Sequence, residues 1–369
     1  MSLVLNGTTG ITNLPSINSG QLGGRRNIVY NGEMKVAQRS TSVTGLGATS
    51  GYFTLDRWFM FLQATAGRLT MAQVADGPAG FANCMKLTTT TADTSIAAGE
   101  RLQLLQVFEG QDLQQLKKGT SSAEAVTVSF YVKANAAALY VCELLDSDGS
   151  RMNTQSFAVT TDWNRIELTF VGDTASAIVD DNTASLYLSI WLHGGATFTG
   201  GTFASNTWAA STAANRFAVA NRTSIFDATS RTFFITGVQM ELGSTATEFE
   251  SRSFGEELAL CQRYCFVMAP STNASVAPAF ARSTTVAFGI AELPVTMRAT
   301  PSLAFSANND FQVQFLGSVA TSTAMAASPE LHKNMIAFTA TVSSGLTAGQ
   351  GMYIRDLNGG ATITAAAEL

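Results

Sequence analysis

The sequence predicts an all-β protein: a jelly-roll β-sandwich, then a short helix and a smaller C-terminal β domain, with an extended N-terminal arm. Three observations lead to this fold class. Many short segments alternate apolar and polar residues with a period of two, which is typical of half-buried antiparallel strands. Clusters of Gly, Asn, Asp and Thr separate these segments. No helical patterns alternate with the strands, which favours a sandwich over a parallel α/β sheet.

The composition indicates a globular chain whose surface is partly covered by other chains. Hydrophobic residues make up 46% of the 369 residues, which suffices for a core, while only 13% are charged, against about 25% in typical soluble domains. The net charge of -5 comes without a block of Lys or Arg, which excludes DNA and RNA as partners. With neither a secretory signal nor an apolar run of about 18 residues, the chain is expected to fold in the cytosol without membrane insertion.

Residues 1–27 are predicted to form the arm, since they are rich in Gly, Asn, Thr and Ser and show too little apolar periodicity for a domain. The pair Asn6-Gly7, a strong hairpin-turn signal, ends a short apolar alternation. A small hairpin docked on another chain and a flexible leader both fit this pattern.

Residues 28–252 are predicted to form the jelly roll, because the strand signal continues throughout this range. The clearest pattern is LYLSIWLHGG, in which four aliphatic residues alternate with Tyr187, Ser189, Trp191 and His193. The aliphatic side of this strand should join the core, and the opposite side is aromatic.

The aromatic side supports two interpretations. Tyr187, Trp191 and His193 project together, and Trp208 lies in a loop of small polar residues, so these four are the candidate carbohydrate-binding residues, with flat rings that meet sugar faces. Alternatively, the second sheet, a loop or a neighbouring subunit covers this side, because tryptophans are common in cores and interfaces. The first interpretation expects Trp191→Ala to weaken glycan binding, and the second expects it to impair folding or assembly.

Residues 253–268 are predicted to form a connecting helix between the two β domains. Ser253 and Glu256 have the spacing of a capping box, in which each side chain accepts a hydrogen bond from the other residue's backbone N–H. An apolar pattern at helical spacing follows.

The apolar stripe of this helix consists of Leu258, Cys261 and Cys265. No large helical partner exists elsewhere in the chain, so the stripe should pack on the end of the jelly roll or on the same helix of two sister chains. These three residues are therefore the candidate trimer interface. Residues 269–369 are predicted to form the C-terminal β domain, whose low aliphatic density suggests that it is stable mainly when associated.

The sequence carries no recognisable catalytic or cofactor motif, such as a phosphate-binding loop, a dinucleotide fingerprint or a nucleophile elbow. The only histidines, His193 and His332, lack metal-ligand spacing to Cys261 and Cys265, and the four cysteines are too scattered for a disulfide framework. Acidic pairs such as Asp180-Asp181 are typical of turns. We therefore expect no enzyme activity, no metal and no cofactor, with calcium binding left open.

Recognisable motifs lie along nearly the whole chain. In order they include NIVYNGEMKVAQRST, YFTLDRWFMF, TVSFYVKA, WNRIELTFVGD, LPVTMRATPSL and a closing AAAEL. The most specific segment runs from Gly237 to Tyr264, where GVQMELGSTATEFE precedes EELALCQRY. This series resembles a widespread family of bacteriophage tail-fibre or minor structural proteins. One departure is Cys265-Phe266, where the family commonly has an aromatic pair.

The resemblance implies a jelly roll similar to carbohydrate-binding modules, an N-terminal segment that docks on the virion and distal parts that meet the host surface. Such fibre proteins are usually homotrimers, and no catalytic residues come with the family. The expected partners are therefore two sister chains, tail or capsid proteins bound through the arm, and a host surface glycan. The expected location is the virion, which is assembled in the host bacterial cytoplasm.

Three functions follow from these observations. The first is a trimeric tail fibre that attaches to glycans on the host cell. The alternative is a purely structural adaptor, collar or capsid decoration protein, which the arm fits equally well. The third is a polysaccharide depolymerase, which would normally need a repetitive β-helix and paired acids, whereas the chain shows no repeat with a period of about 20 to 50 residues.

Overall fold

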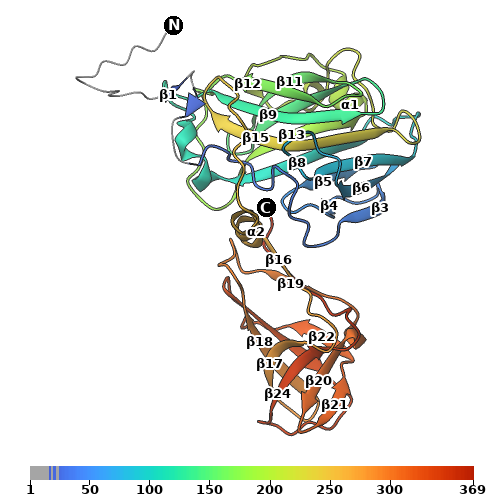
Figure 1. The fold of residues 1–369 in the computed structure, drawn as a ribbon. Helices are drawn as coiled ribbons and strands as arrows, with labels where there is room; N and C mark the ends of the chain where they lie inside the picture. The colour runs from blue at the N-terminus through green and yellow to red at the C-terminus, as the bar shows by residue number, and fades with distance from the viewer. Residues whose placement is uncertain (1–15, 18–19, 22–24) are drawn as a thin grey trace, which may run out of the picture. The chain divides into compact units, whose positions relative to one another are not determined.

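The structure, a computed structural model, describes residues 16–17, 20–21 and 25–369. It confirms the all-β fold class: antiparallel sheets dominate (Figure 1), and the described residues form only two short α-helices. The chain divides into two compact units, residues 1–252 and 253–369. Within the described residues, no helix combines the length and the apolar character that crossing a membrane requires.

The predicted arm lies mostly outside the described residues, and so does the Asn6-Gly7 turn. Its described part contains the short antiparallel pair β1 (Ser16–Ile17) and β2 (Gly20–Gln21).

The N-terminal unit is a jelly-roll sandwich of two antiparallel sheets. The first, called the β13 sheet, has the order β14 (Ala209–Ala210), β11 (Arg151–Val159), β10 (Ala138–Asp146), β13 (Ala184–Gly194), β8 (Arg101–Glu109), β5 (Phe59–Gln63) and β4 (Gly51–Tyr52). The second, called the β15 sheet, has the order β12 (Asn164–Phe170), β9 (Val126–Ala134), β15 (Thr232–Leu242), β7 (Cys84–Thr91), β6 (Arg68–Val74) and β3 (Ser42–Leu46).

The core of this unit lies between the two sheets and follows from the period-two pattern. Leu188 and Ile190 of β13 and Val128 and Phe130 of β9 belong to one cluster of buried hydrophobic residues, each at most 1% exposed. The alternate residues of each strand point to the other side of their sheet. What covers that other side decides where a ligand can bind.

Several short helical segments lie in the connections of the sandwich. They are η1 (Gly110–Asp112), η2 (Gln114–Leu116), α1 (Ala196–Thr199) and η3 (Ala213–Asn215). The last two belong to the long connection between β13 and β15, which folds over part of the β13 sheet.

The C-terminal unit begins with α2 (Phe254–Gln262), and its predicted capping box is confirmed. Ser253 Oγ accepts a hydrogen bond from the backbone N–H of Glu256, and the Glu256 carboxylate accepts one from the backbone N–H of Ser253. The helix is shorter than the predicted range 253–268, because Cys265–Met268 forms strand β16. Its partner strand lies about a hundred residues later in the chain, so no local pattern reveals this pairing.

Two sheets make up the rest of this unit. The smaller has the order β16, β25 (Ile363–Ala366) and β19 (Ser302–Phe305). The larger has the order β21 (Ser318–Thr321), β20 (Phe311–Phe315), β24 (Gly351–Asp356), β17 (Ser275–Ala281), β18 (Val286–Glu292), β23 (Met335–Thr341) and β22 (Ala324–Ala327), and η4 (Asn308–Asp310) precedes β20. Seven of the eighteen buried residues in the hydrophobic cluster of the C-terminal unit are alanines, and each of these buries little apolar area.

Candidate functional site

Trp191 lies on the aromatic side of β13, but it is fully buried. Its ring stacks on Phe217, with centroids 5.8 Å apart, and packs against Phe198 of α1 at 5.4 Å. Its indole N–H donates to Glu143 Oε2 at 2.8 Å, and Arg216 holds the same carboxylate through Nε at 2.7 Å and Nη2 at 2.6 Å. The connection between β13 and β15 therefore covers this part of the strand, as the second interpretation of the aromatic side expects.

His193 is also fully buried. Its Nδ1 lies 2.8 Å from Ser224 Oγ, its Nε2 lies 3.2 Å from Glu100 Oε2, and its ring meets the edge of Phe226 at 5.2 Å. The prediction that Trp191 and His193 bind sugar through exposed rings is therefore wrong. A strand pattern shows on which side of a sheet a residue points, but not which loop covers that side.

The environment of His193 contains a second buried carboxyl group, Asp93. Burial lowers the pKa of His193 to about 4, so the imidazole is neutral at pH 7. Burial and a hydrogen bond with Asp93 raise the pKa of Glu100. Burial by itself would raise the pKa of Asp93, but hydrogen bonds with Glu100 and with the backbone N–H groups of Ser95 and Ala66 lower it overall. Of the two carboxyl groups, that of Glu100 is therefore the easier to protonate.

Trp208 occupies a different environment. It is partly buried, its indole N–H donates to the carbonyl of Val171 at 2.6 Å, and the Lys118 ammonium lies 4.5 Å from its ring centroid. Lys118 in turn forms buried ion pairs with Asp146 at 2.5 Å and Asp173 at 2.7 Å. The Trp208 ring thus packs on a buried ion-pair network at the edge of the sandwich.

Tyr187 is partly exposed on β13, between Leu145 of β10 and Val107 of β8. Burial, followed by the nearby Asp148 charge, raises its pKa. The four residues predicted to bind carbohydrate therefore do not form one exposed aromatic surface, since Tyr187 and Trp208 are partly exposed whereas Trp191 and His193 are buried.

The sequence predictions did not include a row of aromatic residues on β5 and β4, at one edge of the β13 sheet. Phe59 and Phe61 of β5 alternate with Met60 and Leu62, which belong to the core, so they point to the outer side. Tyr52 of β4 pairs with Phe59, and the ring centroids are 5.0 Å apart. All three aromatic residues of this row are partly exposed. The alternation in FMFLQ is a local signal for this row, since it places phenylalanines on the side opposite the core.

Polar groups flank this aromatic row. The Arg101 guanidinium lies 4.0 Å from the Phe61 ring centroid, and its Nε donates to Gln63 Oε1 at 2.8 Å. Gln103 is paired with Phe61 across the sheet, and within the described part of the chain its buried Nε2 has no hydrogen-bond acceptor. We call the residues Tyr52, Phe59, Phe61, Arg101 and Gln103 the aromatic strip. It combines flat apolar rings with N–H donors, which is the chemistry that sugar recognition needs.

The predicted trimer-interface residues lie elsewhere than expected. Cys261 and Cys265 are fully buried within the single chain, Leu258 is half-buried, and none of the four cysteines forms a disulfide. Cys265 belongs to β16 rather than to the helix. This placement corrects the expectation that the two cysteines share a helical stripe that faces sister chains.

No protein-family model and no curated protein matches the chain. The similar solved structures include one of CBM4, with 15% identity over 57% of this chain and 97% of that chain and a TM-score of 0.31. The family 11 carbohydrate-binding module from Clostridium thermocellum, in complex with a β-1,3-1,4-mixed-linked tetrasaccharide, has 12% identity, covers 57% of this chain and 99% of its own, and gives a TM-score of 0.28.

Bacteriophage CBA120 tailspike protein 4 has 12% identity over 58% of this chain and 21% of its own, with a TM-score of 0.28. At such identities and TM-scores, these likenesses assign neither a family nor a ligand to this chain. Its ligand has to be inferred from its own residues.

Proposed function

We propose that this chain is a bacteriophage fibre protein that attaches to glycans on the host cell surface and acts by binding rather than by catalysis. The aromatic strip carries the glycan-binding part of the proposal. The motifs between Asn27 and Tyr264, which resemble tail-fibre proteins, support the fibre part and the location in the virion.

The aromatic strip suits a sugar chain because its rings lie in one row. The centroids of Tyr52 and Phe59 are 5.0 Å apart and those of Phe59 and Phe61 are 6.3 Å apart, so neighbouring rings can contact one or two adjacent sugar units. Ring faces and edges pack against the C–H groups of a sugar, and the partly exposed Arg101 guanidinium supplies donors for its oxygens.

The charges beside the strip indicate the class of glycan. The guanidinium of Arg101 lies at the Phe61 end, and that of Arg39 lies 5.3 Å from the Tyr52 ring centroid at the other end. Guanidinium groups bind carboxylates and phosphates through paired N–H donors. We therefore propose acidic surface polysaccharides as the preferred ligands.

Phe61→Ala should weaken binding to an acidic bacterial surface polysaccharide by about tenfold. The reason is that one ring contact of about 1.4 kcal/mol corresponds to a factor of ten in Kd. The measurement is titration of the intact protein with polysaccharides that the wild type captures on an array of bacterial surface glycans. Because Phe61 is only partly buried, the melting temperature should change little.

The control is Val179→Ala, which shortens an apolar side chain that is 54% exposed on the N-terminal unit outside the aromatic strip and should leave the affinity unchanged. Equal affinities for Phe61→Ala and the wild type would refute the aromatic strip as the binding site. A wild type that captures no glycan at all would favour the structural adaptor, collar or decoration protein instead.

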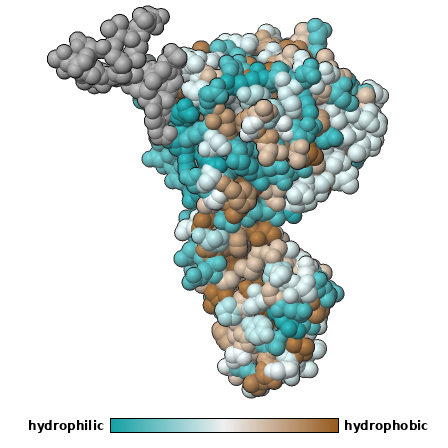
Figure 2. All heavy atoms as spheres, viewed as in Figure 1, coloured by the Kyte–Doolittle hydropathy of each residue, from teal (hydrophilic) through white to brown (hydrophobic). Residues whose placement is uncertain are grey.

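We also propose that the chain forms a homotrimer through its C-terminal unit and contacts tail or capsid proteins through its arm. Among the described residues, six of the nine exposed large hydrophobic ones lie in this unit: Phe254, Phe280, Ile290, Leu316, Val319 and Tyr353. Figure 2 shows apolar residues on the surface of this unit. Exposed apolar surface of this kind typically marks an interface. Three copies would also present three aromatic strips, which strengthens weak binding through avidity.

Light scattering of the purified chain should give the mass of three chains. Phe280→Asp, which places a charge where an apolar residue is 44% exposed, should shift the mass towards one chain. Val171→Asp is the matched control, since Val171 is 46% exposed on the N-terminal unit, and it should remain trimeric. A stable monomer for the wild type would contradict the trimer without affecting the proposal for the aromatic strip.

A further inference from the structure

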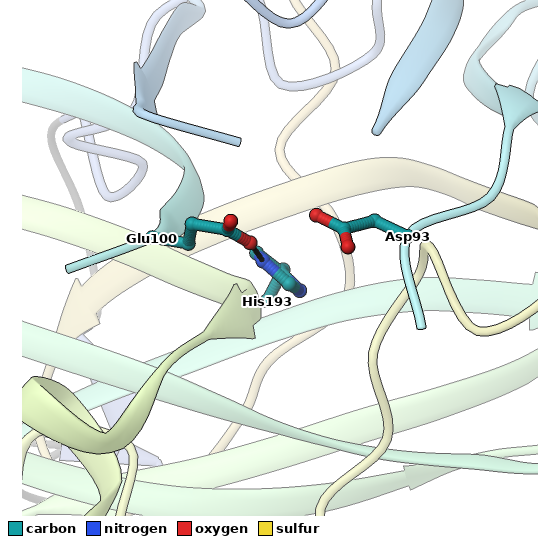
Figure 3. Close-up of side chains that lie close together, drawn as sticks. All are labelled: Asp93, Glu100 and His193. Atoms are coloured by element: carbon teal, nitrogen blue, oxygen red, sulfur yellow. Dashed lines mark hydrogen bonds and ion pairs between the residues drawn. The ribbon is translucent and has the colours of Figure 1, made fainter. Parts of the chain in front are cut away.

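Three buried side chains meet in the N-terminal unit although they come from distant segments. Asp93 follows β7, Glu100 directly precedes β8, and His193 lies near the end of β13. One ligand atom from each residue lies within 4.8 Å of the other two, and the residues are 5%, 4% and 0% exposed. Figure 3 shows the two carboxyl groups pointing towards each other with the imidazole between them.

The charge of this cluster is not balanced by a cationic side chain. Within residues 25–369, neither Asp93 nor Glu100 forms an ion pair with a lysine or an arginine, and Glu100 Oε2 instead lies 3.2 Å from His193 Nε2. Two carboxyl groups buried this close together call for a cation, because burying unpaired negative charge is costly.

Three other buried carboxylates of the same unit have a cationic partner within the chain. Asp146 and Asp173 share the Lys118 ammonium, and Glu143 is held by the Arg216 guanidinium. Unlike these three, Asp93 and Glu100 lie close together without such a partner, which leaves room for a cation that the chain itself does not supply.

The orientation of His193 also suits a metal ligand. Its Nδ1 faces Ser224 Oγ at 2.8 Å, which leaves Nε2 directed at the two carboxyl groups. A ring nitrogen that binds a metal is usually supported by a hydrogen bond from the other ring nitrogen to an oxygen. On the opposite side, the backbone N–H groups of Ala66 and Ser95 donate to the Asp93 carboxylate at 3.2 and 3.3 Å and hold it in place.

We propose that Asp93, Glu100 and His193 bind a divalent transition-metal ion of the zinc type. An imidazole nitrogen with two carboxylate oxygens fits Zn²⁺, whereas Ca²⁺ prefers six to eight oxygen ligands. The bound ion balances the buried negative charge of the two carboxyl groups. It also joins the connection between β7 and β8 to the end of β13, so the role is structural and is separate from glycan binding.

The test uses the full chain without a histidine tag, treated with EDTA, incubated with ZnCl₂ and desalted. Elemental analysis should find one zinc ion per chain, and zinc should raise the melting temperature of the EDTA-treated protein. Glu100→Gln and Asp93→Asn keep the side-chain shape but remove a negatively charged ligand. Each should weaken zinc binding by about 10-fold to 100-fold. The control His332→Gln removes the exposed histidine and should keep the zinc.

X-ray absorption of the zinc-loaded wild type keeps the proposal testable if the variants fail to fold. Nitrogen and oxygen neighbours without sulfur would support the cluster, whereas sulfur neighbours would show that the cysteines bind the ion and would overturn the proposal. Zinc-free protein after desalting, or equal zinc retention by Glu100→Gln and the wild type, would overturn it as well.

Discussion

Replacing Trp191 with alanine is expected to lower the free energy of unfolding of the N-terminal unit by about 3 to 5 kcal/mol, the usual cost of removing a large buried aromatic side chain. The substitution empties the space between Phe198 and Phe217 and removes the N–H donor to Glu143. The Glu143 carboxylate stays paired with Arg216, so the cost comes mainly from lost packing.

Urea titration followed by circular dichroism measures this change. Trp191→Phe should cost less than Trp191→Ala, because the smaller ring still packs on Phe217. The exposed Val179 of the same unit offers a control, since Val179→Ala should change the free energy by no more than about 0.5 kcal/mol. A Trp191→Ala protein of unchanged stability that had lost glycan binding would instead support the exposed sugar platform.

Replacing Lys118 with methionine is expected to lower the free energy of unfolding by about 3 to 5 kcal/mol, because it leaves the buried Asp146 carboxylate without a cation. The side chains of Asp146 and Asp173 are 0% and 1% exposed. Asp173 keeps an ion pair with Arg151 at 2.8 Å, whereas no second lysine or arginine within residues 25–369 pairs with Asp146. The Trp208 ring also loses the ammonium on which it packs.

The neighbouring Lys117 provides a matched control. Its ion pair with Glu124 is exposed, with side chains 54% and 41% accessible, so Lys117→Met should cost about 1 kcal/mol or less. Similar costs for the two lysine variants in thermal or urea unfolding would contradict the importance of the buried network.

The cost of Lys118→Met should also depend on pH. Burial by itself would raise the pKa of Asp173, but hydrogen bonds from Lys118 and Arg151 lower it below the ordinary value of 3.8. A lowered folded-state pKa stabilises the protein above the unfolded value, and this stabilisation is lost as the pH falls through the folded value. The difference between the variant and the wild type should therefore shrink below about pH 4.

The strands and the helix start were predictable because they depend on local signals. The alternation in LYLSIWLHGG placed Leu188 and Ile190 in the core, where the structure has them, and the Ser253 capping box marks the start of α2. The end of α2 was not predictable in the same way. Cys265–Met268 becomes a strand because it pairs with Ile363–Ala366, a contact that sequence neighbours do not encode.

The candidate site was less predictable than the fold. The alternation correctly directed Trp191 to the side of β13 opposite Leu188 and Ile190, but Phe217 and Arg216, which cover it, lie in a loop without periodicity. The exposed aromatic strip required the pairing of β4, β5 and β8, three strands whose order in the sheet no local pattern predicts.

The sequence alone determined the all-β class, which residues of a strand share one side of the sheet, and the capped start of α2. These features depend on residues within a few positions of one another. Only the tertiary structure decided which side of each sheet is exposed to solvent. It also brought Asp93, Glu100 and His193 together in one buried site. Residues so far apart in the chain meet through sheet order and loop packing, which are set by the free energy of the whole fold rather than by any local segment.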